Sequence, residues 1–178
     1  FSMITWTSVG LMGAAATIAG QNLGAGKPDR AYHGVFAAAR IGLTVAAIVG
    51  AMFLLIPTPL LGIFGASEGQ VADIGRELLR YLALSGFFIS AALTFTGGLQ
   101  GTGDTKSPLY ITLVSQLVIP LGLCTVLESL RPLHPHDIWL AIVLGHFTRC
   151  ALSFLRFRQG KWRAIKVDLG PARPAPAS

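Results

Sequence analysis

The stretch VFAAARIGLTVAAIVGAMFLLIP, residues 35–57, holds one charged side chain and is long enough to cross a lipid bilayer as a single helix. Four more apolar stretches accompany it, at Ser2–Gln21, Leu79–Leu99, Leu109–Leu127 and Ile138–Leu155. A helix needs roughly 20 apolar residues to cross the hydrocarbon core. The sequence therefore predicts an all-α, polytopic transmembrane bundle with five spanning helices.

The composition supports a membrane protein over a soluble one. Hydrophobic residues make up 52% of the chain and charged residues 12%, and the mean hydropathy is +0.62. Soluble domains carry about 25% charged residues. A soluble protein with five buried helices would also need amphipathic helices to cover them, and the stretches are apolar on all sides.

The charges predict how the helices are oriented. Basic residues follow the first, third and fifth stretches, which lie on one side of the membrane if all five cross: Lys27, Arg30, Lys106, Arg156, Arg158, Lys161, Arg163, Lys166 and Arg173. The other side carries Glu68, Asp73, Glu128 and Asp137, with Arg131 as its cation. Because Lys and Arg mark cytoplasmic loops, we expect the N-terminus outside and the C-terminus in the cytoplasm.

The two ends of the chain lead to further expectations. Residues 1–163 are expected to form the bundle and 164–178 a disordered cytoplasmic tail. The basic segment after the last span is more consistent with a membrane-surface anchor than with a nucleic-acid-binding arm. The first stretch lacks the basic start of a signal peptide. The odd helix count and the opening at Phe1 suggest a fragment of a longer protein.

Two glycine-rich breaks share one design, in which an apolar helix is followed by a Gly-rich stop, an acid, a base and a proline. They read AGQNLGAGKPDRA (Ala19–Ala31) and GGLQGTGDTKSP (Gly97–Pro108). Glycine suits the end of a helix and proline the start of the next. The turn residues expected to shape these breaks are Gly20, Gln21, Gly24, Gly26, Gly101, Gly103, Asp104 and Pro108. Large side chains at Gly101 or Gly103 should prevent the close turn geometry.

Local features predict where the helices start, break and bend. Prolines at 57 and 59 should end the second helix and leave Leu60–Phe64 as an interfacial piece. The third helix should begin near Val71, with i,i+3 ion pairs Asp73–Arg76 and Glu77–Arg80. In the fourth span, Gln116 and Pro120 predict a kink or local opening.

The sequence contains no convincing motif for nucleotide binding, metal binding or catalysis. The segment Gly24–Lys27 lacks the spacing and the preceding strand of a phosphate-binding loop. The segment His134–Asp137 is better explained as a solvated loop than as a metal site, because no other ligands are near it in the sequence. Cys124 and Cys150 lie within spans and should be free, buried thiols. No spacing suggests a catalytic group, so an enzyme is not expected.

Polar side chains inside the spans are the candidates for a functional site. The candidates for lining a substrate cavity are Ser85, Ser90, Thr94, Gln116, His146 and Arg149. Their alternative role is structural, through hydrogen bonds between helices or to their own helix, with Arg149 snorkelling to the interface. His146 is the strongest candidate, since a neutral imidazole is buried cheaply and titrates near physiological pH.

The two breaks, together with the ending RFRQGKW (Arg156–Trp162), resemble the MATE (multidrug and toxic compound extrusion) transporters. The resemblance covers residues 1 to about 163 and implies helices eight to twelve of a twelve-helix protein built from two six-helix lobes. It also implies a secondary antiporter of a bacterial inner membrane, which exports organic and possibly cationic compounds in exchange for Na⁺ or H⁺. The partners would be these substrates, the bilayer and the missing N-terminal lobe, with no nucleic acid and no cofactor beyond the coupling ion.

The sequence departs from this family in one respect and leaves alternatives open. Such transporters usually couple through carboxylates inside the membrane, and no acid lies mid-span here, so the coupling acid is expected in the missing half. A lipid-linked oligosaccharide flippase would need a more cationic cavity, to which only Arg149 and Arg40 could contribute. A membrane scaffold would explain the spans but not the two matching breaks.

Overall fold

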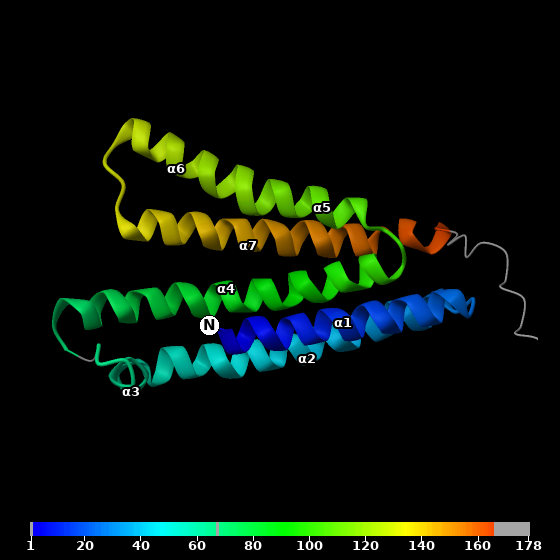
Figure 1. The fold of residues 1–178 in the computed structure, drawn as a ribbon, viewed down its shortest axis with the longest axis horizontal. Helices are drawn as coiled ribbons and strands as arrows, with labels where there is room; N and C mark the ends of the chain where they lie inside the picture. The colour runs from blue at the N-terminus through cyan, green and yellow to red at the C-terminus, as the bar shows by residue number, and fades with distance from the viewer. Residues whose placement is uncertain (1, 67, 166–178) are drawn as a thin grey trace, which may run out of the picture.

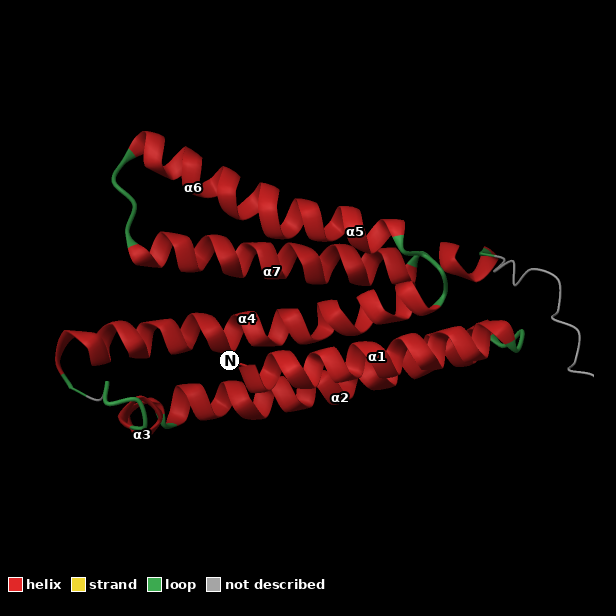
Figure 2. Ribbon diagram, viewed as in Figure 1, coloured by secondary structure: helices red, strands yellow, loops and turns green. Residues whose placement is uncertain are grey.

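The computed structural model of the chain describes residues 2–66 and 68–165, and helices joined by turns make up this part (Figure 2). Five helical segments are long and apolar enough to span a membrane: Ser2–Gly24, Pro28–Leu55, Gly69–Gly101, Lys106–Leu130 and Pro135–Arg158. The predicted all-α bundle with five membrane-spanning helices is confirmed. The first, fourth and fifth segments extend about three residues beyond their predicted stretches at one or both ends. The second and third begin about two and three turns earlier than their predicted stretches, and the second ends two residues sooner, at Leu55.

The helices run up and down in one bundle, with α4 (Gly69–Gly101) at its centre (Figure 1). Helices α1 (Ser2–Gly24) and α2 (Pro28–Leu55) pack on one side of α4, and α7 (Pro135–Arg158) packs on the other. The remaining span packs mainly on α7 and touches α4 only near its start. Every residue from Ile89 to Leu99 is buried, so α4 is the core around which the other helices are arranged.

Both predicted breaks and the end of α7 lie at the same end of the bundle, which we call the basic end (Figure 1). It carries Lys27, Arg30, Lys106, Arg156 and Arg158. The opposite end carries the connection from α2 to α4 and the loop between α6 and α7. The bundle therefore separates the charged connections as the sequence predicted, whichever side of the membrane each end faces.

The connection between α2 and α4 contains a short helix that was not predicted. Helix α2 ends at Leu55, just before the two prolines, and Pro57 then starts α3 (Pro57–Gly62), which includes the first residues of the predicted interfacial piece at 60–64. Proline suits the first turn of a helix because its missing N–H would have no partner there. Of the two predicted ion pairs, Asp73–Arg76 forms at 2.8 Å. Within the described chain Arg80 makes no pair with Glu77 and instead lines a cavity beside α2.

Helices α1 and α4 approach until their backbones touch. A Cβ placed on Gly97 would clash with the carbonyl oxygen of Met12, and one on Gly101 with that of Ala16. From the other side, a Cβ on Gly20 would lie 2.8 Å from the carbonyl oxygen of Gly101. Small residues allow such approach, which membrane helices need because lipid gives them no hydrophobic drive to associate. Gly101 is thus required for helix packing, and not for turn geometry as the sequence suggested.

The predicted bend in the fourth span is a π-helical turn. The span consists of α5 (Lys106–Leu113), the turn Val114–Val118, which we call the π-turn, and α6 (Ile119–Leu130). Pro120 has no N–H to donate to the carbonyl of Gln116, and its ring would clash with that carbonyl in a regular helix. An extra residue in the turn relieves this conflict, and such bulges are frequent at functional sites.

A cluster of aromatic rings closes the basic end. It joins Tyr32 and Phe36 of α2, Phe95 of α4, Phe154 and Phe157 of α7, and Trp162 of the following 3₁₀ turn, Lys161–Ala164. The rings of Phe157 and Trp162 stack with centroids 5.0 Å apart, and both side chains are fully buried. The indole N–H of Trp162 donates to the carbonyl of Phe157 at 2.8 Å. The end of α7 is therefore folded back onto the bundle.

We expect Gly97→Ala to lower the free energy of unfolding by about 1–3 kcal/mol, because the added methyl group meets the Met12 carbonyl and α1 has to move. Gly13→Ala in α1 is the matched control, since a Cβ there meets nothing within 4 Å. Alanine should stabilise that helix by up to about 1 kcal/mol. Thermal unfolding of both variants in one detergent measures the difference. Equal midpoints would contradict the backbone contact between α1 and α4.

Candidate functional site

The six cavity candidates fall into two groups in the structure. Ser85, Ser90 and Thr94 are buried on α4, where Ser90 and Thr94 face Gly42 of α2. The Thr94 hydroxyl donates to the Ser90 carbonyl at 2.9 Å, a hydrogen bond within its own helix. For Thr94, this is the structural role that the sequence left open. Ser90 and Thr94 lie in the packed contact among α1, α2 and α4.

The other three candidates, Gln116, His146 and Arg149, come together on α7 and the π-turn. Ser153 joins them, because residues 146, 149 and 153 share one face of α7. In the described chain these four residues hold all the buried side-chain nitrogen or oxygen atoms that lack a protein partner: Gln116 Nε2, His146 Nδ1, Arg149 Nε and Ser153 Oγ. We call the four residues the polar seam. Buried polar atoms are rarely left unpaired, so the polar seam is unusual.

The π-turn places Gln116 against α7. A Cβ on Gly145 would lie 2.5 Å from the Ser115 carbonyl oxygen and 3.6 Å from Gln116 Nε2. Only glycine at 145 lets the distorted backbone approach α7 so closely. The bend that Pro120 causes therefore also brings the Gln116 amide beside Gly145, the residue before His146.

Arg149 opens into a cleft between α4 and the start of α5. The cleft has a volume of about 550 Å³, and its lining includes residues from four helices: Met12, Leu93, Thr96, Gln100, Thr105, Lys106, Pro108, Leu109, Thr112 and Arg149. Both of its charged residues, Lys106 and Arg149, are cations. A cleft of this size is within the range that small-molecule ligands occupy.

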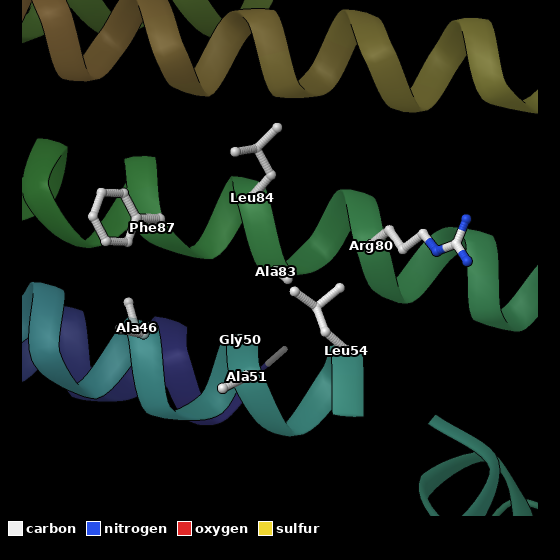
Figure 3. A pocket seen from close by; sticks show the side chains of 9 residues that line it. Ala46, Gly50, Ala51, Leu54, Arg80, Ala83, Leu84 and Phe87 are labelled. Carbon is white, nitrogen blue, oxygen red and sulfur yellow. The ribbon is translucent and has the colours of Figure 1, made fainter. Parts of the chain in front are cut away.

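Two further cavities are almost entirely apolar. One, of about 350 Å³, lies between α2 and α4, where Ala46, Gly50 and Ala51 face Ala83 and Arg80 marks its edge (Figure 3). The other, of about 280 Å³, is lined mainly by aromatic rings of α2, α4 and α7 with Arg40 among them. Neither contains a residue of the polar seam, so the cleft at Arg149 is the stronger candidate for a functional site.

The turn residues take up distinct positions at the basic end. Gly20, Gln21 and Gly24 belong to the end of α1, Gly101 ends α4, and Pro108 is buried in the first turns of α5. Gly26 and Gly103 have positive φ angles of 69° and 89°, a backbone conformation that glycine adopts without strain. Asp104 does more than shape its turn, because it forms a long-range ion pair.

The Asp104 carboxylate is 6% exposed and binds Arg156 at the end of α7, 52 residues away. Its Oδ2 atom accepts hydrogen bonds from Arg156 Nε and Ser107 Oγ, both at 2.9 Å, and Arg156 Nη2 lies 2.8 Å from the same atom in the ion pair. Its Oδ1 atom accepts from the Ser107 backbone N–H at 3.2 Å. We call this group of three residues the clasp, since it ties the turn between α4 and α5 to α7.

The clasp fixes the charge of Asp104. Burial alone would raise the pKa of this carboxyl group, but the hydrogen bonds from Ser107 and Arg156 and the charge of Arg156 outweigh it, so the pKa lies below its ordinary value. Asp104 is therefore ionised at neutral pH. A second pair, Asp29–Arg163 at 3.0 Å, lies nearby, and Arg163 also covers the rings of Tyr32 and Trp162.

These ion pairs give two residues of the basic segment a role within the bundle. Arg156 and Arg163 belong to the segment that is expected to lie at the membrane surface, and acids of the bundle bind both of them. At the opposite end, Arg131 binds Asp137 through two hydrogen bonds of 2.9 and 2.6 Å. The cysteines are free thiols as expected, although Cys124 and Cys150 are only partly buried.

Comparison with known proteins identifies the family. The sequence profile of MatE matches residues 1–126. The chain belongs to the MatE family. The resemblance inferred from the two glycine-rich breaks is thereby confirmed, and a MatE chain with five helices able to span a membrane is an integral membrane protein.

Curated relatives match most of this MatE chain. A probable multidrug resistance protein NorM of Thermotoga maritima is 28% identical over 158 residues, covering 89% of the chain and 34% of the relative. NorM of Mannheimia succiniciproducens is 31% identical over 150 residues (82% and 32%). The multidrug resistance protein MdtK of Edwardsiella ictaluri is 26% identical over 163 residues (89% and 35%). The chain thus spans about a third of the length of these relatives.

Three features of this MatE chain were not found from its sequence. Ser153 was overlooked, although its spacing from His146 and Arg149 places it on their helical face. The clasp has no local signal, because its partners are far apart in the chain. The aromatic cluster does have a local signal, because aromatic residues are frequent in the two segments that it joins, 32–36 and 154–162.

We expect Asp104→Ala to lower the free energy of unfolding of the MatE chain by about 2 kcal/mol, since it leaves Arg156 without its buried acceptor. Asp29→Ala is the matched control, because Asp29 is 77% exposed and such pairs contribute at most about 1 kcal/mol. Thermal or denaturant unfolding in detergent measures both variants.

The effect of Asp104→Ala should also depend on pH. The lowered pKa means that the ionised carboxylate stabilises the fold fully above its ordinary value of 3.8, and that this contribution is lost as the pH falls through the lower folded-state value. Wild-type and variant should therefore converge in acid. A stability difference that stays constant from pH 7 to pH 3 would contradict a charged clasp.

Proposed function

We propose that this chain forms part of one lobe of a multidrug efflux transporter. The observation that carries the proposal is its match, over most of its length, to relatives named as multidrug resistance proteins. A flippase or a scaffold, which the sequence left open, has no comparable support. The chain spans only about a third of those relatives, so the export activity is proposed for a longer protein of which this bundle supplies one wall.

The polar seam and the cleft would line the pathway for the exported compound. Polar atoms without protein partners are costly in a bilayer unless water or a solute reaches them. Arg149 belongs to both features, and the π-turn keeps Gln116 beside them. This arrangement favours a role in which the α7 side of the bundle meets the transported molecule, while the contact of α1, α2 and α4 serves as scaffold.

We further propose alternating access by rocking of two lobes, driven by Na⁺ or H⁺. The backbone contact between α1 and α4 and the clasp between α5 and α7 would make this bundle move as one body. No described carboxylate lines the cleft, so the coupling acid is assigned to a part of the transporter outside the described chain. In this proposal residues 1–163 are the partial lobe and 164–178 a cytoplasmic tail, of which 166–178 lie outside the described residues.

The proposed orientation places the basic end in the cytoplasm, with the bundle in the bacterial inner membrane. Lysine and arginine enrichment in short connections is the physical signal for this assignment. Lys27, Arg30, Lys106 and Arg158 gather at this end in addition to the two arginines held in ion pairs. The C-terminus then faces the cytoplasm.

Dye efflux tests the function directly. Cells that express the complete gene should extrude ethidium, a cationic dye, or carboxyfluorescein, an anionic one, faster than cells with an empty vector. The 178-residue chain expressed alone should extrude neither dye, since one wall cannot enclose a pathway. Absence of export of any dye by the complete protein, or export by the chain alone, would contradict the proposal.

His146→Ala in the complete protein should weaken the dependence of export on pH, because histidine is the side chain whose ordinary charge change lies closest to neutral pH and the Nδ1 atom of His146 is buried without a protein partner. His33→Ala is the matched control, since His33 is exposed near the start of α2. Initial export rates between pH 6 and pH 8 measure the effect. If His146→Ala keeps the wild-type profile, the residue has no part in proton-linked transport.

A further inference from the structure

The cleft at Arg149 combines two cations with no acid. Lys106, the first residue of α5, lies at the basic end of the cleft, and Arg149 lies on α7, nine residues or about 13 Å along the helix axis before that helix ends. Neither forms an ion pair in the described chain, and no carboxylate lines the cleft. Two like charges that share one cleft repel each other unless an anion lies between them.

Arg149 needs an acceptor more than Lys106 does. The Nε atom of Arg149 is buried and has no hydrogen-bond partner in the protein, whereas Lys106 is exposed. A guanidinium within a membrane span is costly to leave unpaired. Its planar set of N–H donors matches the oxygens of a carboxylate or a phosphate. The group that completes Arg149 is therefore an oxyanion.

The remaining lining describes the rest of the ligand. Hydroxyl and amide groups of Thr96, Thr105, Thr112 and Gln100 surround the charged part of the cleft and can donate to further oxygens. Met12, Leu93, Pro108 and Leu109 supply apolar walls on three helices. A ligand that suits both parts has an anionic head and an apolar body.

We propose that this cleft is a binding site for an amphiphilic organic anion, with its phosphate or carboxylate held by Arg149 and Lys106 and its apolar body against α1, α4 and α5. The inference rests on the proposed function for its meaning as a substrate site, and it reverses the expectation of cationic substrates. An organic cation would meet two like charges and no acid in this cleft. The anion can come from the bilayer, as an acidic phospholipid, or from solution.

Native mass spectrometry of the 178-residue chain in an uncharged detergent tests the proposal with matched pairs of ligands. The soluble pair is dodecyl phosphate and dodecyltrimethylammonium, which share a chain length and differ in the sign of the head. The lipid pair is phosphatidylglycerol and phosphatidylcholine with identical acyl chains. We expect the anionic member of at least one pair to bind about tenfold more tightly than its partner, as for one charged hydrogen-bonded contact.

Variants locate the binding site. Arg149→Gln and Lys106→Gln should each reduce the affinity for the anionic ligand by about tenfold. Arg40→Gln is the matched control, because it removes an exposed guanidinium of α2 that lies outside this cleft. This variant should bind the anionic ligand with the wild-type affinity. Circular dichroism reports whether each variant is folded. Should Arg149→Gln fail to fold, Lys106→Gln at its exposed position still decides the outcome.

Several results would overturn the proposal. Equal affinity within both ligand pairs would show that the sign of the head does not matter. Affinities unchanged in Lys106→Gln and Arg149→Gln would place the anion elsewhere. A preference confined to dodecyl phosphate supports a soluble anion, and one for phosphatidylglycerol supports a lipid. Binding is measured without an ion gradient, so the two tests are separate. Failed dye export would contradict the proposed function and leave the anion site standing. Dye export by a protein that binds both members of each ligand pair equally would contradict the anion site and leave the proposed function standing.

Discussion

The backbone contact between α1 and α4 is the constraint on which the bundle depends. Lipid tails are as apolar as leucine, so only close packing and polar contacts hold membrane helices together. Glycines at 20, 97 and 101 remove the side chains that would separate the two helices. This contact covers one side of α4, and α2 and α7 cover the others, so that every residue from Ile89 to Leu99 is buried. The position of α7, and with it the site, follows from this arrangement.

Polar groups are treated differently on the two sides of α4. On the α1 side, Ser8 and Thr94 donate to carbonyls of their own helices at 2.7 and 2.9 Å, so their burial costs little. On the α7 side, Gln116, His146 and Arg149 have buried atoms without such partners. The first side is a packed scaffold, and the second retains unsatisfied donors and acceptors. The solute contact proposed above therefore belongs to the second side.

Local physics in the sequence was enough to predict the spans, the two breaks and the bend before Pro120, because apolar length, glycine, proline and hydropathy act within a few residues. The roles that depend on packing were not predictable. Gly101 looked like a turn residue and is a helix contact, and Arg80 was paired with Glu77 but lines a cavity. Asp104 and Arg156 are 52 residues apart, and only the fold brings them together.

The clasp also explains why the cleft keeps its positive charge. Asp104 is two residues before Lys106 and would be its natural counter-ion. Its Oδ2 atom already accepts from Arg156 Nε and from Ser107 Oγ and lies 2.8 Å from Arg156 Nη2, and its Oδ1 atom accepts from the Ser107 backbone, so little acceptor capacity remains for a lysine. The same contacts that fasten α5 to α7 thus withdraw the nearest acid from the cleft. Lys106 and Arg149 therefore have no counter-ion from the protein in the cleft. The ion pair between Asp104 and Arg156, which lies outside the cleft, thus determines which charge the bound molecule carries.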